Sequence, residues 1–435
     1  MSPQAAIAEV TAARACAYTV VRRVFEHGAY ADRAFRAEAD RAGLNGRDRA
    51  QAMALAYATV QRAGTLDHVV TALCNRPPRR LEPAVLAALR LGLAQLLALD
   101  GFAQHAAVDE SVTLAKRDAP AAAGLVNAVL RRATREGRAL LDALDDLTPE
   151  AAAVRHSVPE WLALLWWREL GADRARSLLA TVNDPPESAL RVNTLVADVD
   201  DVAAGLGVRS HAAAELPEGL VLDGPFDVHG SEEWARGEVM AHSRASMLVA
   251  RTLAPQAGER ILDLCAAPGA KTTHLAALAG DGARLTAIER HPGRARTLEA
   301  TLERMHVRAA QVEVRDAAVP AAGAAAEAYE RILVDPPCSG LGTLQSRPDL
   351  RWRARPERIP ELAAQQHRIL EAAADAAAGT ATLVYSVCTI SAAESDGVVE
   401  RFLEARPDWS LEQVRRPAPD VDGTDGFYIA RLRRG

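Results

Sequence analysis

Residues 260–272 read Arg-Ile-Leu-Asp-Leu-Cys-Ala-Ala-Pro-Gly-Ala-Lys-Thr, and this stretch decides the fold. Ile261–Leu264 is a short, mainly apolar run of the kind that forms a buried parallel strand. Small residues and a turn follow at 266–270, and Lys271–Leu278 has the pattern of a helix. A strand, a tight turn of small residues and a helix N-terminus together form a site where a cofactor can approach the backbone.

Asp263, at the end of this predicted strand, adds a negative charge to the site. The charge disfavours a pyrophosphate and favours a cationic cofactor, such as the amino-acid and sulfonium end of S-adenosylmethionine. An ordinary strand–helix turn is the alternative for this stretch alone. The choice between a cofactor site and an ordinary strand–helix turn therefore depends on the rest of the chain.

From about residue 236 the chain alternates between strand-like and helix-like segments. The expected strands are 260–265, 285–289, 310–314, 331–335 and 380–388, and the expected helices are 271–279, 292–305, 357–377 and 392–405. Two last segments, Ser410–Val414 and Gly426–Leu432, could complete the sheet. The pattern predicts a doubly wound, Rossmann-like sheet whose ligands bind at the carboxyl ends of the strands.

The 435 residues are too many for one hydrophobic core, so we expect several domains. Residues 1–145 predict an all-α domain without strand-like alternation, with helical periodicity at Ala12–Glu26, Arg47–Arg62, Glu82–Leu99, Val108–Lys116 and Ala121–Arg135. Residues 146–235 predict a small α+β linking region with strands at Leu190–Asn193 and Gly219–Leu222 and a helix at Val199–Gly205. Residues 236–435 form the predicted α/β domain.

The net charge of −6 is unevenly distributed along the chain. Residues 1–145 carry 19 Lys/Arg against 15 Asp/Glu, whereas the rest carries 32 against 42. A basic surface for RNA phosphates could be formed by Arg47, Arg49, Arg62, Arg131, Arg132 and Arg135. An ordinary solvated helix face is the alternative, and charge alone favours it.

Several classes of protein are disfavoured by composition. The sequence contains no run of about 18 apolar residues, so we expect no membrane span. The first residues also lack the pattern of a secretory leader. The five cysteines are scattered and have no CxxC spacing, so we expect neither a disulfide framework nor a metal site. This cysteine usage is typical of the reducing cytoplasm.

Acidic residues follow the predicted strands in a regular order. Glu289 ends the second strand, 26 residues after Asp263, where such folds place a carboxylate that binds ribose hydroxyls. Asp316 follows the third strand and is a candidate for the adenine edge, and Asp335 ends the fourth. The series favours a nucleoside-containing cofactor over an ordinary turn.

Two cysteines, Cys338 and Cys388, directly follow the fourth and fifth predicted strands. Cytosine C5 is not nucleophilic enough to take a methyl group unaided, but attack of a cysteine thiolate on C6 makes C5 enamine-like. The adduct must then lose the C5 proton and expel the cysteine, which needs a second group. An acid near N3, here Asp335, would stabilise charge on the ring. Two buried structural cysteines are the alternative, which the acid series disfavours.

The runs Asp263–Thr272, Asp335–Thr343 and Tyr385–Thr389 resemble the signature motifs of the Sun/Nop2 family of RNA cytosine-5 methyltransferases. Residues 1–145 contain His105-Ala-Ala-Val-Asp-Glu and Gly124-Leu-Val-Asn-Ala-Val-Leu-Arg-Arg. They resemble the NusB-like RNA-binding domain of the branch that acts on small-subunit ribosomal RNA. The resemblance implies a class I methyltransferase domain that uses S-adenosyl-L-methionine, with 16S ribosomal RNA as partner. We expect a monomer without metal.

The resemblance also implies roles for individual residues. Cys388 is the implied nucleophile and Cys338 assists product release, with Asp335 as the third catalytic residue. The expected cofactor contacts are Cys265, Ala266, Ala267, Pro268, Gly269, Ala270, Lys271, Glu289, Asp316 and Asp335. DNA cytosine-5 methyltransferases place their nucleophile on a Pro-Cys pair similar to Pro337-Cys338, so the opposite assignment of the cysteines is the alternative.

Ala270 stands where the family usually has a second glycine, which we expect to be tolerated if this residue is not at positive φ. The rival function is a non-catalytic RNA-binding or ribosome-assembly factor, which needs neither thiol. Closer rivals are a methyltransferase that modifies another base atom and a cytosine-5 enzyme that acts on another RNA.

Overall fold

The computed structural model describes residues 10–319 and 328–435, which divide into two compact units. Unit 1 contains the chain up to Asp184 together with the later segment Leu344–Ala354. Unit 2 contains Pro185–Thr343 and Arg355–Gly435. Within the described ranges, no helix is long and apolar enough to cross a bilayer.

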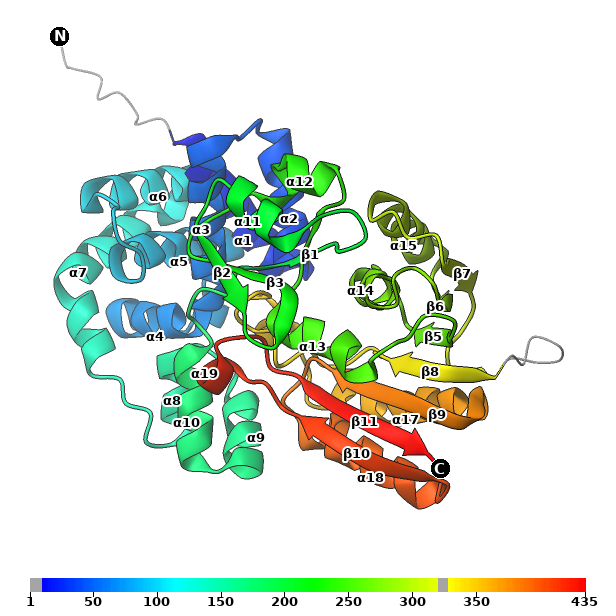
Figure 1. The fold of residues 1–435 in the computed structure, drawn as a ribbon. Coiled ribbons are helices and arrows are strands. Elements are labelled where there is room, and N and C mark those ends of the chain that lie inside the picture. Colours follow the sequence, from blue (N-terminus) through cyan, green and yellow to red (C-terminus); the bar gives the residue numbers. More distant parts are fainter. Residues whose placement is uncertain (1–9, 320–327) are drawn as a thin grey trace, which may run out of the picture. The chain divides into compact units, whose positions relative to one another are not determined.

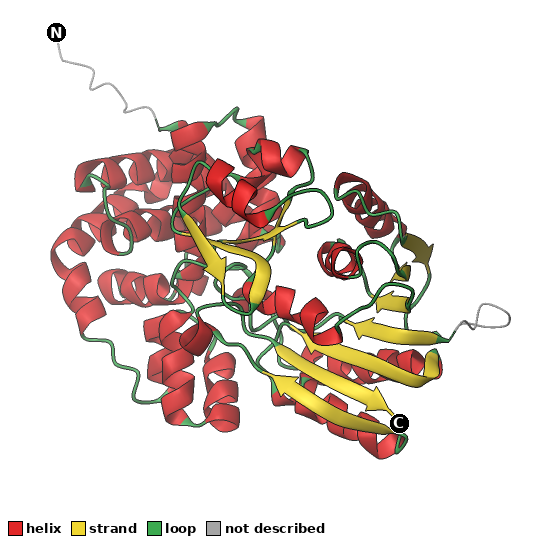
Figure 2. Ribbon diagram, in the orientation of Figure 1, coloured by secondary structure: helices red, strands yellow, loops and turns green. Residues whose placement is uncertain are grey.

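Unit 1 is built from helices (Figure 2). They are α1 (Ala12–His27), α2 (Ala31–Arg41), α3 (Gly46–Gln61), α4 (Ala63–Cys74), α5 (Pro83–Leu97), α6 (Gln104–Asp118), α7 (Ala123–Asp142), α8 (Pro149–His156), α9 (Glu160–Leu170), α10 (Ala172–Thr181) and the short α16 (Leu350–Arg353). Apolar residues at helical spacing form its core, as Val20 and Val24 of α1 and Leu89 of α5 illustrate. The predicted all-α character of residues 1–145 is confirmed, but the sequence analysis missed α2 and α4.

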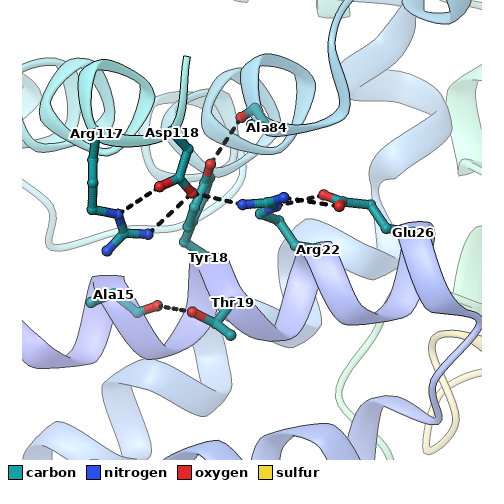
Figure 3. Close-up of polar contacts among 8 residues, drawn as sticks. All are labelled: Ala15, Tyr18, Thr19, Arg22, Glu26, Ala84, Arg117 and Asp118. Carbon is teal, nitrogen blue, oxygen red and sulfur yellow. Dashed lines mark hydrogen bonds and ion pairs between the residues drawn. The ribbon is translucent and has the colours of Figure 1, made fainter. Parts of the chain in front are cut away.

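Polar contacts join α1 to its neighbours (Figure 3). The Tyr18 hydroxyl donates to the Ala84 carbonyl at 3.2 Å. Arg22 donates to Glu26 one turn further along α1 at 2.5 Å and to Asp118 at the end of α6 at 2.7 Å. One arginine thereby pairs with carboxylates on two helices, which fixes α1 against α6.

The segment Leu344–Ala354 is anchored in unit 1 by Arg351, whose side chain is fully buried. Its guanidinium donates to five acceptors: the carbonyls of Gln61, Ser157, Val182 and Leu344, and Asn183 Oδ1. The next residue, Trp352, donates its indole N–H to the Val60 carbonyl at 2.7 Å. A chain truncated near residue 146 would lack Val60 and Gln61, so such a truncation would disturb this anchor as well as remove helices.

We predict that Arg351→Ala lowers the free energy of unfolding by at least about 3 kcal/mol, because several buried acceptors lose a charged donor at once. Denaturant titration followed by circular dichroism measures the change. The matched control is Arg138→Ala on α7, an exposed arginine that pairs with Asp142, for which we expect a change within about 0.5 kcal/mol. Equal unfolding midpoints for both variants would contradict the anchor.

Unit 2 begins with a small four-stranded antiparallel sheet in the order β2-β3-β1-β4. Its elements are β1 (Ala189–Val192), α11 (Val199–Gly205), β2 (Ser210–Ala213), β3 (Leu216–Leu222), α12 (Glu232–Ala235) and β4 (Val239–Ala241). Leu190, Val192 and Leu220 lie in its core, and α11 packs on β3. The predicted small α+β region is confirmed, although β2 and β4 were not predicted.

The large sheet of unit 2 has seven strands in the order β10-β11-β9-β8-β5-β6-β7 (Figure 1). The strands are β5 (Arg260–Leu264), β6 (Arg284–Glu289), β7 (Ala310–Val314), β8 (Tyr329–Val334), β9 (Ala377–Val387), β10 (Trp409–Arg415) and β11 (Tyr428–Arg434). The pairs among β5 to β9 are parallel, whereas β11 is antiparallel to both β9 and β10. This confirms the predicted Rossmann-like sheet, with the two last strands completing one edge.

Helices cover both faces of this sheet, which explains the apolar runs of its central strands. The helices are α13 (Arg244–Leu253), α14 (Ala270–Leu278), α15 (Pro292–Arg304), α17 (Arg358–Asp375) and α18 (Asp396–Ala405), and a short α19 (Pro419–Asp422) precedes the last strand. Leu262 and Leu264 share a core cluster with α17 and α18. Ile261, which alternates with them, belongs to the cluster of α13, α14 and α15. Asp263 therefore faces the helices that carry the predicted cofactor turn.

Candidate active site

The turn between β5 and α14 packs closely against α15 through a glycine. Gly269 adopts a φ of 106°, where a side chain is strained, and a Cβ there would come within 2.9 Å of Leu298. Helix α14 begins at Ala270, so its first N–H groups lie at the turn. Ala270 is not among the residues at positive φ, which explains why alanine is tolerated.

The sequence predicts a fixed negative charge on Asp263, but the structure shows a carboxyl whose ionisation is disfavoured. Its carboxyl is buried, accepts a hydrogen bond from the Thr272 hydroxyl at 2.6 Å, and has a pKa raised by burial to about 7. Desolvation therefore disfavours the charged form of this carboxyl, which is not a fixed negative charge. Its bond to Thr272 ties the end of β5 to the first turn of α14.

Two other predicted carboxylates follow β6 and β7. Glu289 ends β6, is buried, and accepts a hydrogen bond from the His291 N–H at 2.8 Å. Arg294 lies 3.5 Å from Glu289 and also donates to the Ala267 carbonyl in the turn. Asp316 follows β7, remains half-buried, and accepts from the N–H of the residue two positions later at 3.0 Å.

Asp335 connects the cofactor turn to the strand that precedes Cys388. One carboxylate oxygen pairs with Lys271 Nζ at 2.8 Å, and the other accepts from the Ser386 hydroxyl at 3.0 Å. Burial lowers the pKa of Lys271, but the negative charges of Asp335 and Cys388 outweigh it and raise the pKa overall. Lys271 is thus a permanent cation close to both groups, 5.3 Å from the centre of the Phe427 ring.

The two predicted catalytic cysteines face each other, with 3.4 Å between Cys338 Sγ and Cys388 Sγ. Both side chains are partly exposed. Interaction with Cys388 and burial raise the pKa of Cys338 well above its ordinary value, and either thiol can donate to the other.

The cluster brings together Asp335, Lys271, Cys338 and Cys388, all named from the sequence. No role was predicted for Ser386, whose hydroxyl lies two residues before Cys388 near the end of β9. Sequence reasoning also missed Phe427 and Arg294, for which no local pattern exists.

Small residues, helix N–H groups and several carboxylates together fit a nucleoside with a cationic amino-acid end. Burial and the charges of Asp335, Asp263 and Glu289 raise the pKa of Cys265 to about 12. Cys265 is therefore a neutral thiol close to three carboxylates, whose negative potential attracts an ammonium or a sulfonium. The adjacent sulfur pair adds a nucleophile, so the site can combine binding of a cationic cofactor with covalent chemistry.

Three families match successive parts of the chain. Residues 250–433 match the 16S rRNA methyltransferase RsmB/F family, and residues 11–135 match the NusB family. Residues 158–229 match the RsmF/B-like ferredoxin-like domain.

Curated relatives and solved structures match most of the chain. The probable ribosomal RNA small subunit methyltransferase B of Synechocystis sp. is 34% identical over 97% of this chain and 99% of the relative. Ribosomal RNA small subunit methyltransferase B of Thermus thermophilus is 34% identical over 89% of each chain. The crystal structure of PH0851 has a TM-score of 0.82 at 25% identity, covering 98% of this chain and 99% of that chain.

A methyltransferase homolog protein from Pyrococcus horikoshii has a TM-score of 0.60 at 26% identity, over 66% of this chain and 100% of that chain. The fold, the order of domains and the near full-length relatives agree with one another. The chain belongs to the ribosomal RNA small subunit methyltransferase B family.

Proposed function

We propose that this protein methylates C5 of a cytosine in small-subunit ribosomal RNA, using S-adenosyl-L-methionine and a covalent bond from Cys388 to C6 of the base. The observation that carries the proposal is the pair of sulfurs 3.4 Å apart beside the Asp335–Lys271 ion pair. The names of the relatives, which describe small-subunit ribosomal RNA methyltransferases, support the choice of RNA.

S-adenosylmethionine supplies an electrophilic methyl group when it is bound. The turn from Cys265 to Lys271 would hold its amino-acid part, with Asp335 adding to the negative potential. Glu289 would accept from the ribose hydroxyls, and Asp316 would reach the adenine edge. The sequence order of these groups along parallel strand ends supports this assignment.

The Cys388 thiolate attacks C6, which breaks the C5–C6 double bond and raises electron density at C5. Asp335, paired with Lys271, would stabilise the charge that develops on the ring near N3. After C5 has taken up the methyl group, it must lose its proton, and the electron pair then expels Cys388 as a thiolate.

Cys338 is suited to the release step because its protonation depends on the state of Cys388. While Cys388 is a thiolate, its charge favours the protonated form of Cys338. Once Cys388 is bound to carbon it carries no charge, so Cys338 can lose its proton more readily and act as the base. A non-catalytic RNA-binding factor would need neither this sulfur pair nor the ion pair beside it.

We predict that Glu289→Ala weakens S-adenosylmethionine binding by roughly 1–3 kcal/mol, because two ribose hydroxyls lose a buried acceptor. Isothermal titration calorimetry measures the affinity. Glu299→Ala on the exposed side of α15 is the matched control and should bind as the wild type does. An unchanged affinity for Glu289→Ala would place the ribose elsewhere.

We predict different failures for the two catalytic cysteines. Cys388→Ser should form neither product nor a covalent complex, because no bond to C6 is made. Cys338→Ala should still attack and methylate but release slowly, so an RNA–protein adduct that depends on S-adenosylmethionine should accumulate. Denaturing gel electrophoresis with labelled RNA separates these outcomes.

Cys74→Ala, at the end of α4, controls for the loss of a thiol and should behave as the wild type. If Cys388→Ser accumulates the adduct and Cys338→Ala does not, the two roles must be exchanged. Release of tritium from cytosine labelled at C5 tests the modified atom independently.

We also propose that unit 1 contributes affinity for RNA rather than chemistry. Among the candidate arginines, Arg131 and Arg135 on α7 are exposed, and Arg47 is exposed at the start of α3. Arg49 instead pairs with Asp40, and Arg62 is half-buried. The α7 pair, one helical turn apart, is therefore the better candidate for phosphate contacts.

We predict that the double variant Arg131→Ala/Arg135→Ala binds RNA more weakly and lowers the slope of log affinity against log salt by roughly 1.4 to 1.8, as expected for two lost phosphate contacts. Fluorescence anisotropy at several salt concentrations measures the slope. Arg138→Ala, whose side chain is paired with Asp142, serves as the control. Identical slopes for the double variant and the wild type would favour a protein-docking role for this helix.

A further inference from the structure

We propose that Glu394 is a positioning residue that clamps the loop after Cys338 to the loop after Cys388 and thereby sets the distance between the two sulfurs. Its consequence for catalysis rests on the cytosine-5 chemistry proposed above. The clamp itself is a geometric claim about contacts inside unit 2 and can be tested without RNA.

Glu394 lies in a 3-10 turn, Ala392–Glu394, six residues after Cys388 and just before α18. Its side chain is fully buried. A carboxylate in such a place is strongly unfavourable unless hydrogen-bond donors satisfy its oxygens. The identity of these donors therefore shows what the residue holds in place.

The first set of donors comes from the Cys338 loop. The Ser339 N–H donates to Glu394 Oε1 at 2.8 Å, and the Ser339 hydroxyl donates to Oε2. Gln366 Nε2 donates to Glu394 Oε1 and also to the Pro337 carbonyl, both at 3.0 Å. The residues on both sides of Cys338 are thereby fixed, one directly by Glu394 and the other through Gln366.

The second set comes from the Cys388 loop. The Thr389 hydroxyl lies 2.7 Å from the Ser339 hydroxyl and 3.3 Å from Glu394 Oε2. Each hydroxyl has one hydrogen to donate, so the chain Thr389 to Ser339 to Glu394 uses each hydrogen once. The residue directly after each cysteine is thus held by the same buried carboxylate.

Glu394 is itself held in place by the strand that leads to Cys388. The Tyr385 hydroxyl, buried in β9, lies 2.7 Å from the Glu394 carbonyl and 3.1 Å from Gln366 Oε1. This rigid support distinguishes Glu394 from a carboxylate on a mobile loop. The position of Glu394 is therefore fixed relative to β9, and Glu394 in turn fixes the loops that follow both cysteines.

The sulfur positions matter because the two thiols must reach neighbouring carbons of one base. Cys388 attacks C6, and Cys338 removes the proton from C5. A displacement of about 1 Å in such a pair can cost on the order of a hundredfold in rate. The proposal therefore predicts that loss of the clamp lowers turnover more than it weakens RNA binding.

Oxidative crosslinking of the two cysteines measures their proximity directly. The azo compound diamide accepts two electrons and two protons, so the two S–H bonds break, one S–S bond forms, and diamide becomes a hydrazine. The sulfurs must move from 3.4 Å to about 2.05 Å for this bond. Alkylation quenching followed by peptide mapping gives the rate of the Cys338–Cys388 disulfide in the full-length protein.

We expect the rate in Glu394→Ala to fall by about tenfold, because the loops are no longer held together. Glu394→Gln keeps an acceptor for the Ser339 N–H, and its amide can donate to the Ser339 hydroxyl, so it should recover most of the rate. Glu400→Ala, the same change at an exposed position of α18, should react as the wild type does. A wild-type rate in folded Glu394→Ala would overturn the proposal.

Ser339→Ala serves as a second variant if Glu394→Ala fails to fold by circular dichroism. It removes the hydroxyl link between the two loops but leaves the buried carboxylate with its N–H and amide donors. A slower disulfide rate in this variant supports the clamp, and an unchanged rate contradicts it.

Steady-state kinetics on RNA test the consequence for catalysis. In Glu394→Ala we expect kcat to fall by about tenfold or more, while KM for RNA changes by less than about twofold. A general loss of folded protein would not lower kcat when the concentration of active sites is determined by titration. A rise in KM at constant kcat would contradict a role in positioning. If the wild type methylates no cytosine, the proposed function fails, whereas the disulfide rates still decide on the clamp.

Discussion

The parallel pairing of β8 with β9 is the constraint on which the active site depends. Val334 is paired with Tyr385, so the next residues of each strand, Asp335 and Ser386, lie side by side and form a hydrogen bond. The two cysteines follow within three residues, which brings their sulfurs to 3.4 Å. A slip of one residue would turn Ser386 to the other face of the sheet and separate these groups. The hydrophobic burial that sets the register of the two strands therefore also sets the relative positions of Asp335, Ser386 and the two cysteines.

Charges of both signs lie close to the cysteines of the site. Carboxylates and burial raise the pKa of Cys265 to about 12, so this thiol stays neutral beside the cofactor turn. Lys271 interacts with the negative charges of both Asp335 and Cys388, and both raise its pKa. One lysine therefore places a positive charge close to the carboxylates and to the sulfur pair.

Sequence analysis predicted the sheet, the cofactor turn and the two cysteines, because these depend on local periodicity and on the rule that ligands lie at strand ends. It could not find Glu394, since its function depends on pairing with Ser339, 55 residues earlier, and no local pattern encodes that contact. It assigned a fixed charge to Asp263 because burial, which raises the pKa to about 7, is a tertiary property. It missed α2 because that helix is short and largely polar, with few large apolar residues to show a period.

Unit 1 is discontinuous in sequence, which constrains how it can fold. Its helices up to Asp184 precede most of unit 2, but the segment Leu344–Ala354 completes it. Until Arg351 has been synthesised, the carbonyls of Gln61, Ser157 and Val182 lack the guanidinium that they share in the finished unit. Buried carbonyls without donors are unfavourable, so the last steps of packing in unit 1 must await a segment that begins six residues after Cys338. The chain therefore leads from the loop that carries Cys338 into the segment Leu344–Ala354, whose Arg351 completes the hydrogen bonding of the unit 1 core.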